Sequence, residues 1–114
     1  MTGYTVSALA LDQRAPAARF ALAVSVFDSN RLGVPNLREG NFTVYNLMSE
    51  ARFSITEVQN TTVPGFYRLF LRADPVIQTG ECALALVVTG GQHVVGRVPE
   101  IPDNGHVLVK VRIY

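Results

Sequence analysis

The stretch His106-Val107-Leu108-Val109-Lys110-Val111-Arg112-Ile113 decides the fold, because small apolar residues recur in it at every second position. Successive side chains of a β-strand point to opposite faces, so this spacing predicts a strand with one buried face. The same alternation runs through residues 20–27 and 67–72. No segment carries an apolar stripe of helical period over three turns. The chain is therefore expected to fold from strands.

Weaker versions of the pattern predict four further strands, at residues 4–11, 41–46, 52–58 and 81–89. Turn-forming residues separate these segments, at 28–30, 63–65, 79–80, 90–91 and 103–105. The Asn104-Gly105 pair favours a hairpin turn, since both central residues of a type I′ turn need positive φ. Short strands at this rhythm predict an all-β sandwich or barrel.

Composition limits the class of protein. The 114 residues fit a single domain, 1–114, and a hydrophobic fraction of 48% excludes a disordered chain. Ten basic and nine acidic residues leave a net charge of +1, so no nucleic-acid partner is expected. The longest apolar run, 83–88, is too short to span a bilayer, and residues 1–11 do not resemble a signal peptide. These features fit a cytoplasmic protein and equally a domain excised from a longer exported chain, so the sequence does not distinguish the two compartments.

Several short motifs carry a family resemblance. They are Val26-Phe27-Asp28, Gly33-Val34-Pro35-Asn36-Leu37, Asn41-Phe42-Thr43-Val44, Gly65-Phe66-Tyr67-Arg68-Leu69, Pro75 and Gly80-Glu81-Cys82-Ala83-Leu84-Ala85-Leu86. Together they resemble filamin-type and related bacterial immunoglobulin-like domains. The resemblance implies an immunoglobulin-like antiparallel β-sandwich of about seven strands. It departs at Cys82, which stands where the family has an aromatic residue, so no tyrosine-corner hydrogen bond is expected there.

The sequence offers no catalytic or metal-binding constellation. It lacks a Gly-x-Ser-x-Gly turn, and Cys82 follows Glu81, whose charge would raise a thiol pKa, so we expect a buried structural thiol. His93 and His106 alone make a poor zinc site. The acids Asp12, Asp28, Asp74 and Asp103 form no Asp-x-Asp cluster for calcium, and turn capping explains them. We therefore expect a protein without cofactor or enzymatic activity.

A first candidate interaction surface follows from the alternation at residues 67–72. If Tyr67 and its alternate neighbours point inward, Arg68, Phe70 and Arg72 share one outward row. Arg52 and Phe27 are expected beside this row. Arginine and aromatic residues are enriched in interface anchors. The other interpretation is a solvated face on which long side chains shield two rings.

A second candidate surface lies on the 81–89 strand. With Cys82 and Leu84 inward, Ala83, Ala85 and Val87 point outward. An outer face this apolar is unusual for a solvated sheet. It is a candidate for self-association, or for cover by a terminal segment or another domain.

The leading functional hypothesis is a non-catalytic structural or protein-interaction module, such as one domain of a larger surface, adhesive or secreted assembly. Such a module is expected to bind a protein partner, a neighbouring domain or a second copy of the chain. Binding would use these faces or strand addition at a free sheet edge. The alternative is a sandwich that binds a carbohydrate or small ligand. That alternative relies on Tyr4, Tyr45 and Tyr114, because the chain has no tryptophan.

Overall fold

The computed structural model describes residues 3–47, 51–90 and 104–114. In these residues it forms strands β1 (Thr5–Ala10), β2 (Ala17–Phe27), β3 (Phe42–Asn46), β4 (Arg52–Asn60), β5 (Phe66–Ile77), β6 (Gly80–Thr89) and β7 (Asn104–Ile113), with a short 3-10 helix η1 (Glu39–Asn41) before β3. Each of the seven strands predicted from the sequence is confirmed. The fold is all-β.

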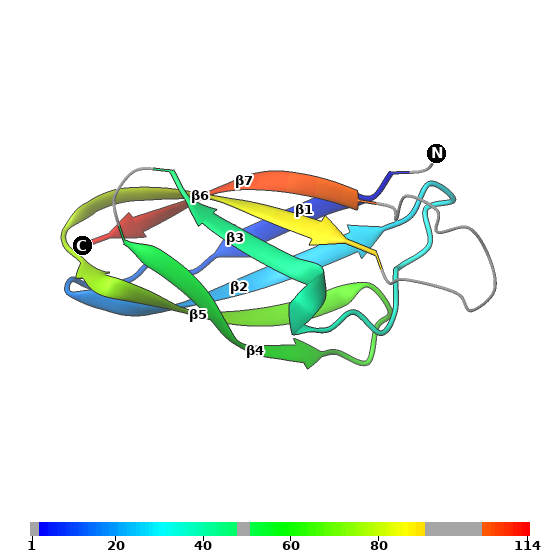
Figure 1. Cartoon of the computed structure of the whole chain (residues 1–114), viewed down its shortest axis with the longest axis horizontal. Coiled ribbons are helices and arrows are strands. Elements are labelled where there is room, and N and C mark those ends of the chain that lie inside the picture. Colours follow the sequence, from blue (N-terminus) through cyan, green and yellow to red (C-terminus); the bar gives the residue numbers. More distant parts are fainter. Residues whose placement is uncertain (1–2, 48–50, 91–103) are drawn as a thin grey trace.

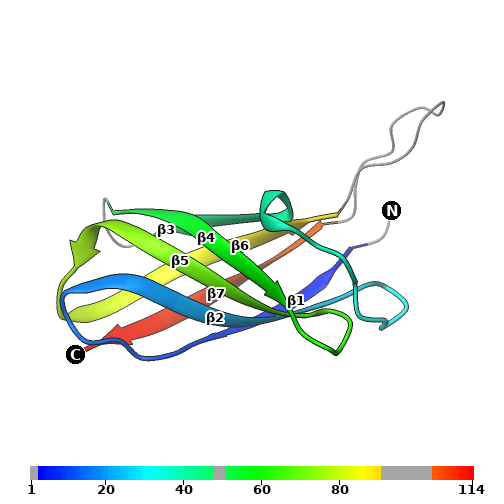
Figure 2. The same ribbon diagram turned by 90° about the horizontal axis from the view of Figure 1, so that it is seen from below.

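The strands form two antiparallel sheets that pack face to face (Figures 1 and 2). One sheet has four strands in the order β1-β2-β5-β4, and the other has three in the order β3-β6-β7. Strands β2 and β5 are the central pair of the larger sheet, and β6 is the centre of the smaller one. The described residues thus form a seven-stranded β-sandwich.

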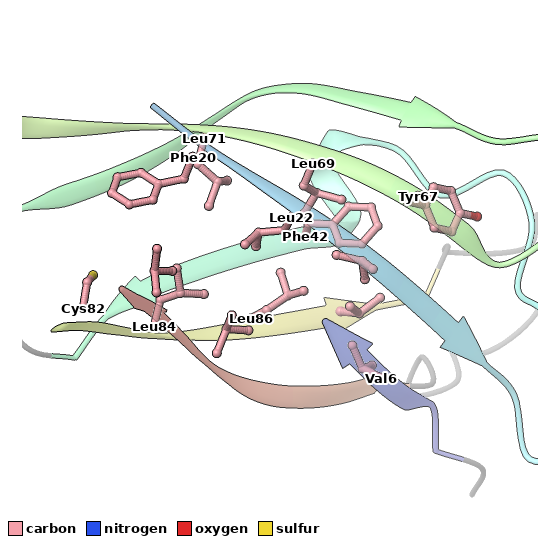
Figure 3. Packing of buried hydrophobic residues seen from close by; sticks show 14 of the residues in the cluster. Val6, Phe20, Leu22, Phe42, Tyr67, Leu69, Leu71, Cys82, Leu84 and Leu86 are labelled. Carbon is pink, nitrogen blue, oxygen red and sulfur yellow. The ribbon is translucent and has the colours of Figure 1, made fainter. Parts of the chain in front are cut away.

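The core lies between the sheets and is made by alternate side chains, as the period-two pattern predicts (Figure 3). Strand β2 contributes Phe20, Leu22, Val24 and Val26; β5 contributes Tyr67, Leu69 and Leu71; β6 contributes Cys82, Leu84, Leu86 and Val88; and β7 contributes Val109, Val111 and Ile113. No described polar or charged residue other than Tyr67 and Cys82 is buried among them. Burial of each large aliphatic side chain stabilises the fold by about 1.5–3 kcal/mol.

One side of the sandwich is closed by contacts between β1 and β7, which belong to different sheets. The Tyr4 N–H donates to the Asn104 carbonyl at 2.8 Å, and the Gln13 N–H donates to the Arg112 carbonyl at 2.9 Å. The residues that flank β1 are thus hydrogen-bonded to the start and the end of β7, and Gln13 pairs with Ile113 in a parallel bridge. The edge strands at the other side of the sandwich are β3 and β4.

The hairpin turn predicted at Asn104-Gly105 is wrong. Both residues lie in β7, where Gly105 pairs with Val88. A Cβ at Gly105 would lie 2.5 Å from the carbonyl oxygen of Tyr4. The close approach of the backbone just before β1 therefore requires glycine here, which explains the Asn-Gly pair without a turn.

A buried tyrosine ties β5 to the connection between β2 and β3. The Tyr67 hydroxyl donates to the Val34 carbonyl and accepts from the Leu37 N–H at 3.2 Å. This tyrosine lies on β5 of the four-stranded sheet, whereas Cys82 lies on β6 of the other sheet, at the opposite end of the core (Figure 3). Burial raises the pKa of Tyr67 above its usual value, and the hydrogen bond from Leu37 opposes part of that rise.

Candidate interaction surfaces

The outer face of the four-stranded sheet carries the arginine–phenylalanine row. Arg68 and Arg72 are exposed and Phe70 is half-buried, while Leu69 and Leu71 between them are buried. The structure thus places the three side chains on one outward row of β5, because alternate residues of the strand fill the core.

Arg52 and Phe27 share this face but lie at its opposite ends. Arg52 stands opposite Asp74 in the β4–β5 register, one outward position beyond Arg72. The Phe27 ring packs edge-to-face on Phe66, with 5.7 Å between ring centroids. Phe27 therefore belongs to a second aromatic contact and not to the surroundings of Phe70.

Sequence reasoning missed Arg19, which the register places directly opposite Arg72. On the same face Ala21 stands opposite Phe70, and Ala23 opposite Arg68. The small Ala21 side chain borders an open hollow of ≈ 640 Å³ beside the longer side chains of Phe70 and Arg72. We call it the Arg19–Arg72 hollow; besides the core residues Phe20 and Leu71, its lining is Gln13, Arg19, Ala21, Thr56, Glu57, Phe70 and Arg72. Extending the alternation one residue before Phe20 would place Arg19 outward, but its cross-strand partner depends on the strand pairing.

The two arginines of the hollow have no acidic partner in the described part of the chain. Neither guanidinium forms an ion pair with a described residue. The nearest acid across the strands, Glu57, instead accepts a hydrogen bond from the Gln59 amide at 3.3 Å. Like charges directly opposite each other in a sheet repel, so this arrangement costs stability.

The outer face of the three-stranded sheet is apolar along its centre. Ala83, Ala85 and Val87 point outward from β6 and are half-buried, as the alternation predicts. In the register Ala85 stands between Tyr45 of β3 and Leu108 of β7. Leu47 continues the outward series of β3, and its N–H donates to the Ala83 carbonyl at 2.9 Å.

The large side chains around this alanine row are open to solvent. Tyr45 is 56% exposed, Leu47 53% and Leu108 69%. We call the group the apolar face: Tyr45, Leu47, Ala83, Ala85, Val87 and Leu108. Sequence reasoning found its β6 row but missed Leu47 and Leu108, because only strand pairing brings β3 and β7 beside β6. His106, Lys110 and Arg112 are exposed along the β7 side, and the Lys110 backbone pairs with Ala83.

Those of the remaining sequence candidates that lie in the described ranges do not converge on a site. Cys82 is buried, and that burial raises the pKa of its thiol, as expected for a structural cysteine. Asp28 caps its own turn, since its carboxylate accepts from the N–H groups of Asn30 and Leu32. In residues 3–47, 51–90 and 104–114 no group of three or more His, Cys, Asp and Glu is placed to hold a metal ion. His93 and Asp103 lie outside these ranges.

The three tyrosines considered for carbohydrate binding do not share a platform. Tyr4 is half-buried beside the first residue of β7, whereas Tyr114 follows the last residue of that strand. Tyr114 instead contacts Arg112, whose guanidinium carbon lies 5.6 Å from the ring centroid. Tyr45 belongs to the apolar face.

The part of the chain that the structure describes is a seven-stranded, two-sheet β-sandwich with one apolar and one arginine-bearing outer face. Comparison with protein-family models, with curated proteins and with solved structures finds no match to it. Among the described residues there is no helix long and apolar enough to cross a membrane.

Proposed function

We propose that this chain is a non-catalytic structural or protein-interaction module built on an immunoglobulin-like sandwich. The strand orders β1-β2-β5-β4 and β3-β6-β7 support the immunoglobulin-like part, since they match the A-B-E-D and C-F-G orders of constant-type domains. A domain of this kind is used as one unit of a larger surface, adhesive or secreted assembly.

The observation that carries the interaction role is the apolar face. Antiparallel sheets that face water on one side have polar outer side chains. Here the central row across the sheet is Tyr45, Ala85 and Leu108. A contiguous exposed apolar patch of this kind marks a contact with another protein surface.

The arrangement of this surface fits the anatomy of a protein interface. Its centre is apolar with one tyrosine, a residue enriched in interface cores, and its β7 border carries Lys110 and Arg112. Apolar centres exclude water, while polar borders stay solvated and set orientation. The face is accordingly buried against a neighbouring domain, a protein partner or a second copy of the chain.

The proposal is tested with Leu108→Lys, which places a charge at the centre of the apolar face. Leu9→Lys is the matched control, because Leu9 is equally open to solvent at 71% exposure but lies on the other sheet. Sedimentation equilibrium up to about 1 mM measures self-association, and affinity capture from the native source measures heterotypic binding. We expect Leu108→Lys to weaken association at least about tenfold and Leu9→Lys to leave it unchanged.

Two results would contradict the proposal. One is a chain that stays monomeric and captures no partner, and the other is an association that both variants weaken equally. A serine-dependent hydrolase activity of the purified domain would contradict its non-catalytic part.

A further inference from the structure

We propose that the Arg19–Arg72 hollow binds the carboxylate of an extended acidic protein segment, with an apolar side chain of the same segment resting on Phe70. This second binding site lies on the sheet opposite the apolar face. It goes beyond the proposed function, which does not depend on it.

The strand register brings two positive charges together. Arg19 and Arg72 are direct cross-strand partners, whose Cβ atoms lie about 5 Å apart in an antiparallel pair. Both side chains are exposed on the outer face. Such a pair is repulsive in the free protein, so an anion that neutralises it gains more than it would at an isolated arginine.

No described acid forms an ion pair with either arginine, although the Glu57 carboxylate lines the hollow near Phe70. Glu57 is engaged with Gln59, and Asp74 stands opposite Arg52 instead of Arg72. Asp12, at the same end of the sandwich, accepts a hydrogen bond from the Tyr114 hydroxyl at 3.2 Å. Arg19 and Arg72 are thus left without an ion-pair partner among the described residues.

The shape of the hollow adds an apolar subsite to the cationic one. Its volume of ≈ 640 Å³ lies within the range of small-ligand pockets, about 300–1,000 Å³. Ala21 forms part of the lining, and the half-buried Phe70 ring stands across from it. Glu57 lies on the Phe70 side of the hollow and repels anions there, which directs a carboxylate to the arginine end.

The spacing of the two subsites matches an extended peptide. Phe70 and Arg72 are two residues apart on one strand, which places their side chains roughly 7 Å apart on the same face. Residues i and i+2 of an extended ligand have the same separation. The hollow therefore fits a Leu-x-Glu spacing, with the planar carboxylate held by the guanidinium forks. Glu57 disfavours the higher charge of a phosphoryl group, so a carboxylate is the better match.

The test uses the full 114-residue chain and the peptide acetyl-Ser-Leu-Ser-Glu-Ser-amide, with its Glu→Gln counterpart as the ligand control. Two-dimensional amide NMR follows the titration. We expect shift changes centred on residues 19, 70 and 72, and an affinity that falls as salt is raised. Arg19→Gln and Arg72→Gln should each weaken binding about tenfold.

Arg68→Gln is the matched protein control, since Arg68 points outward from the same strand but does not line the hollow. It should change binding less than twofold. Because each Arg→Gln change at the hollow relieves repulsion, neither should lower the melting temperature, and a lost signal then reports binding and not unfolding.

Several outcomes would overturn this inference. They are equal binding of the Glu and Gln peptides, equal sensitivity to Arg68→Gln, no binding at 10 mM peptide, or tighter binding of a phosphoserine peptide. None of them affects association through Leu108 on the other sheet, so the two proposals fail independently.

Discussion

Gly33 and Gly65 meet backbone to backbone at one end of the sandwich, with no room for a side chain between them. A Cβ on Gly33 would lie 2.0 Å from the Pro64 carbonyl oxygen, and one on Gly65 would lie 2.6 Å from the Gly33 Cα. Gly65 also has a φ of +87°, which favours glycine. This contact joins the β2–β3 connection to the β4–β5 turn.

Replacement of Gly33 should therefore destabilise the fold strongly. Gly33→Ala forces backbone against backbone, and we expect a loss of about 2–4 kcal/mol in the free energy of unfolding. Urea denaturation measures it. Gly40→Ala is the control, because nothing lies within 4 Å of a Cβ at Gly40. Equal stability of the two variants would show that the β2–β3 connection shifts away from the added methyl group at no cost in free energy.

The Tyr67 hydroxyl should contribute to stability through its two backbone partners. Tyr67→Phe keeps the ring but leaves the Val34 carbonyl and the Leu37 N–H without this partner. Loss of a buried hydrogen-bond partner costs about 1–3 kcal/mol. Chemical denaturation at pH 7 measures the difference, and a variant as stable as the parent would mean that water replaces the hydroxyl.

Alkaline pH should weaken the fold through the same residue. Burial raises the folded-state pKa of Tyr67 above the usual value of 10.0. The unfolded chain thus releases this proton first, so the stabilisation is complete below pH 10 and is lost as the pH rises through the folded-state pKa. Stability measured from pH 9 to 11 should fall less steeply for Tyr67→Phe than for the parent chain. Parallel curves would exclude this linkage.

Truncation of an inward residue of β5 should lower stability, whereas truncation of an outward residue should lower peptide binding. Leu71 is 1% exposed, and Leu71→Ala should cost about 2–5 kcal/mol by opening a cavity. Phe70→Ala should cost less than about 1 kcal/mol but remove binding of a Leu-x-Glu peptide, because the ring lines the hollow. Thermal unfolding and NMR titration separate the two effects. If Phe70→Ala lowered stability as much as Leu71→Ala does, the loss of binding would report unfolding, and the Phe70 ring would be part of the core.

The Cys82 thiol should be unreactive until the protein unfolds. Its side chain is 2% exposed, and burial raises its pKa, so little thiolate forms at neutral pH. We expect a disulfide reagent to label it at least about 100-fold more slowly in native buffer than in denaturant. Rapid native labelling would indicate frequent opening of the β6 end of the core.

The sequence by itself determined the seven strands and, in the most regular of them, which side chains enter the core. Alternation is a local property, since the pleat sends neighbouring side chains to opposite faces whatever the strand pairs with. Phe20, Leu69 and Val109 were thus assigned inward correctly, as were Phe70 and Ala85 outward. Asn104-Gly105 was misread because the same dipeptide serves a turn or a close backbone contact.

Only the tertiary structure decided which of these side chains meet. The pairing of Arg19 with Arg72, of Ala85 with Tyr45 and Leu108, and of Gly33 with Gly65 joins residues more than 20 positions apart. Such pairs depend on register and sheet order, which result from filling one shared core and leave no periodic signal in either segment alone. Local pattern therefore predicts strands and faces, while their assembly creates the surfaces.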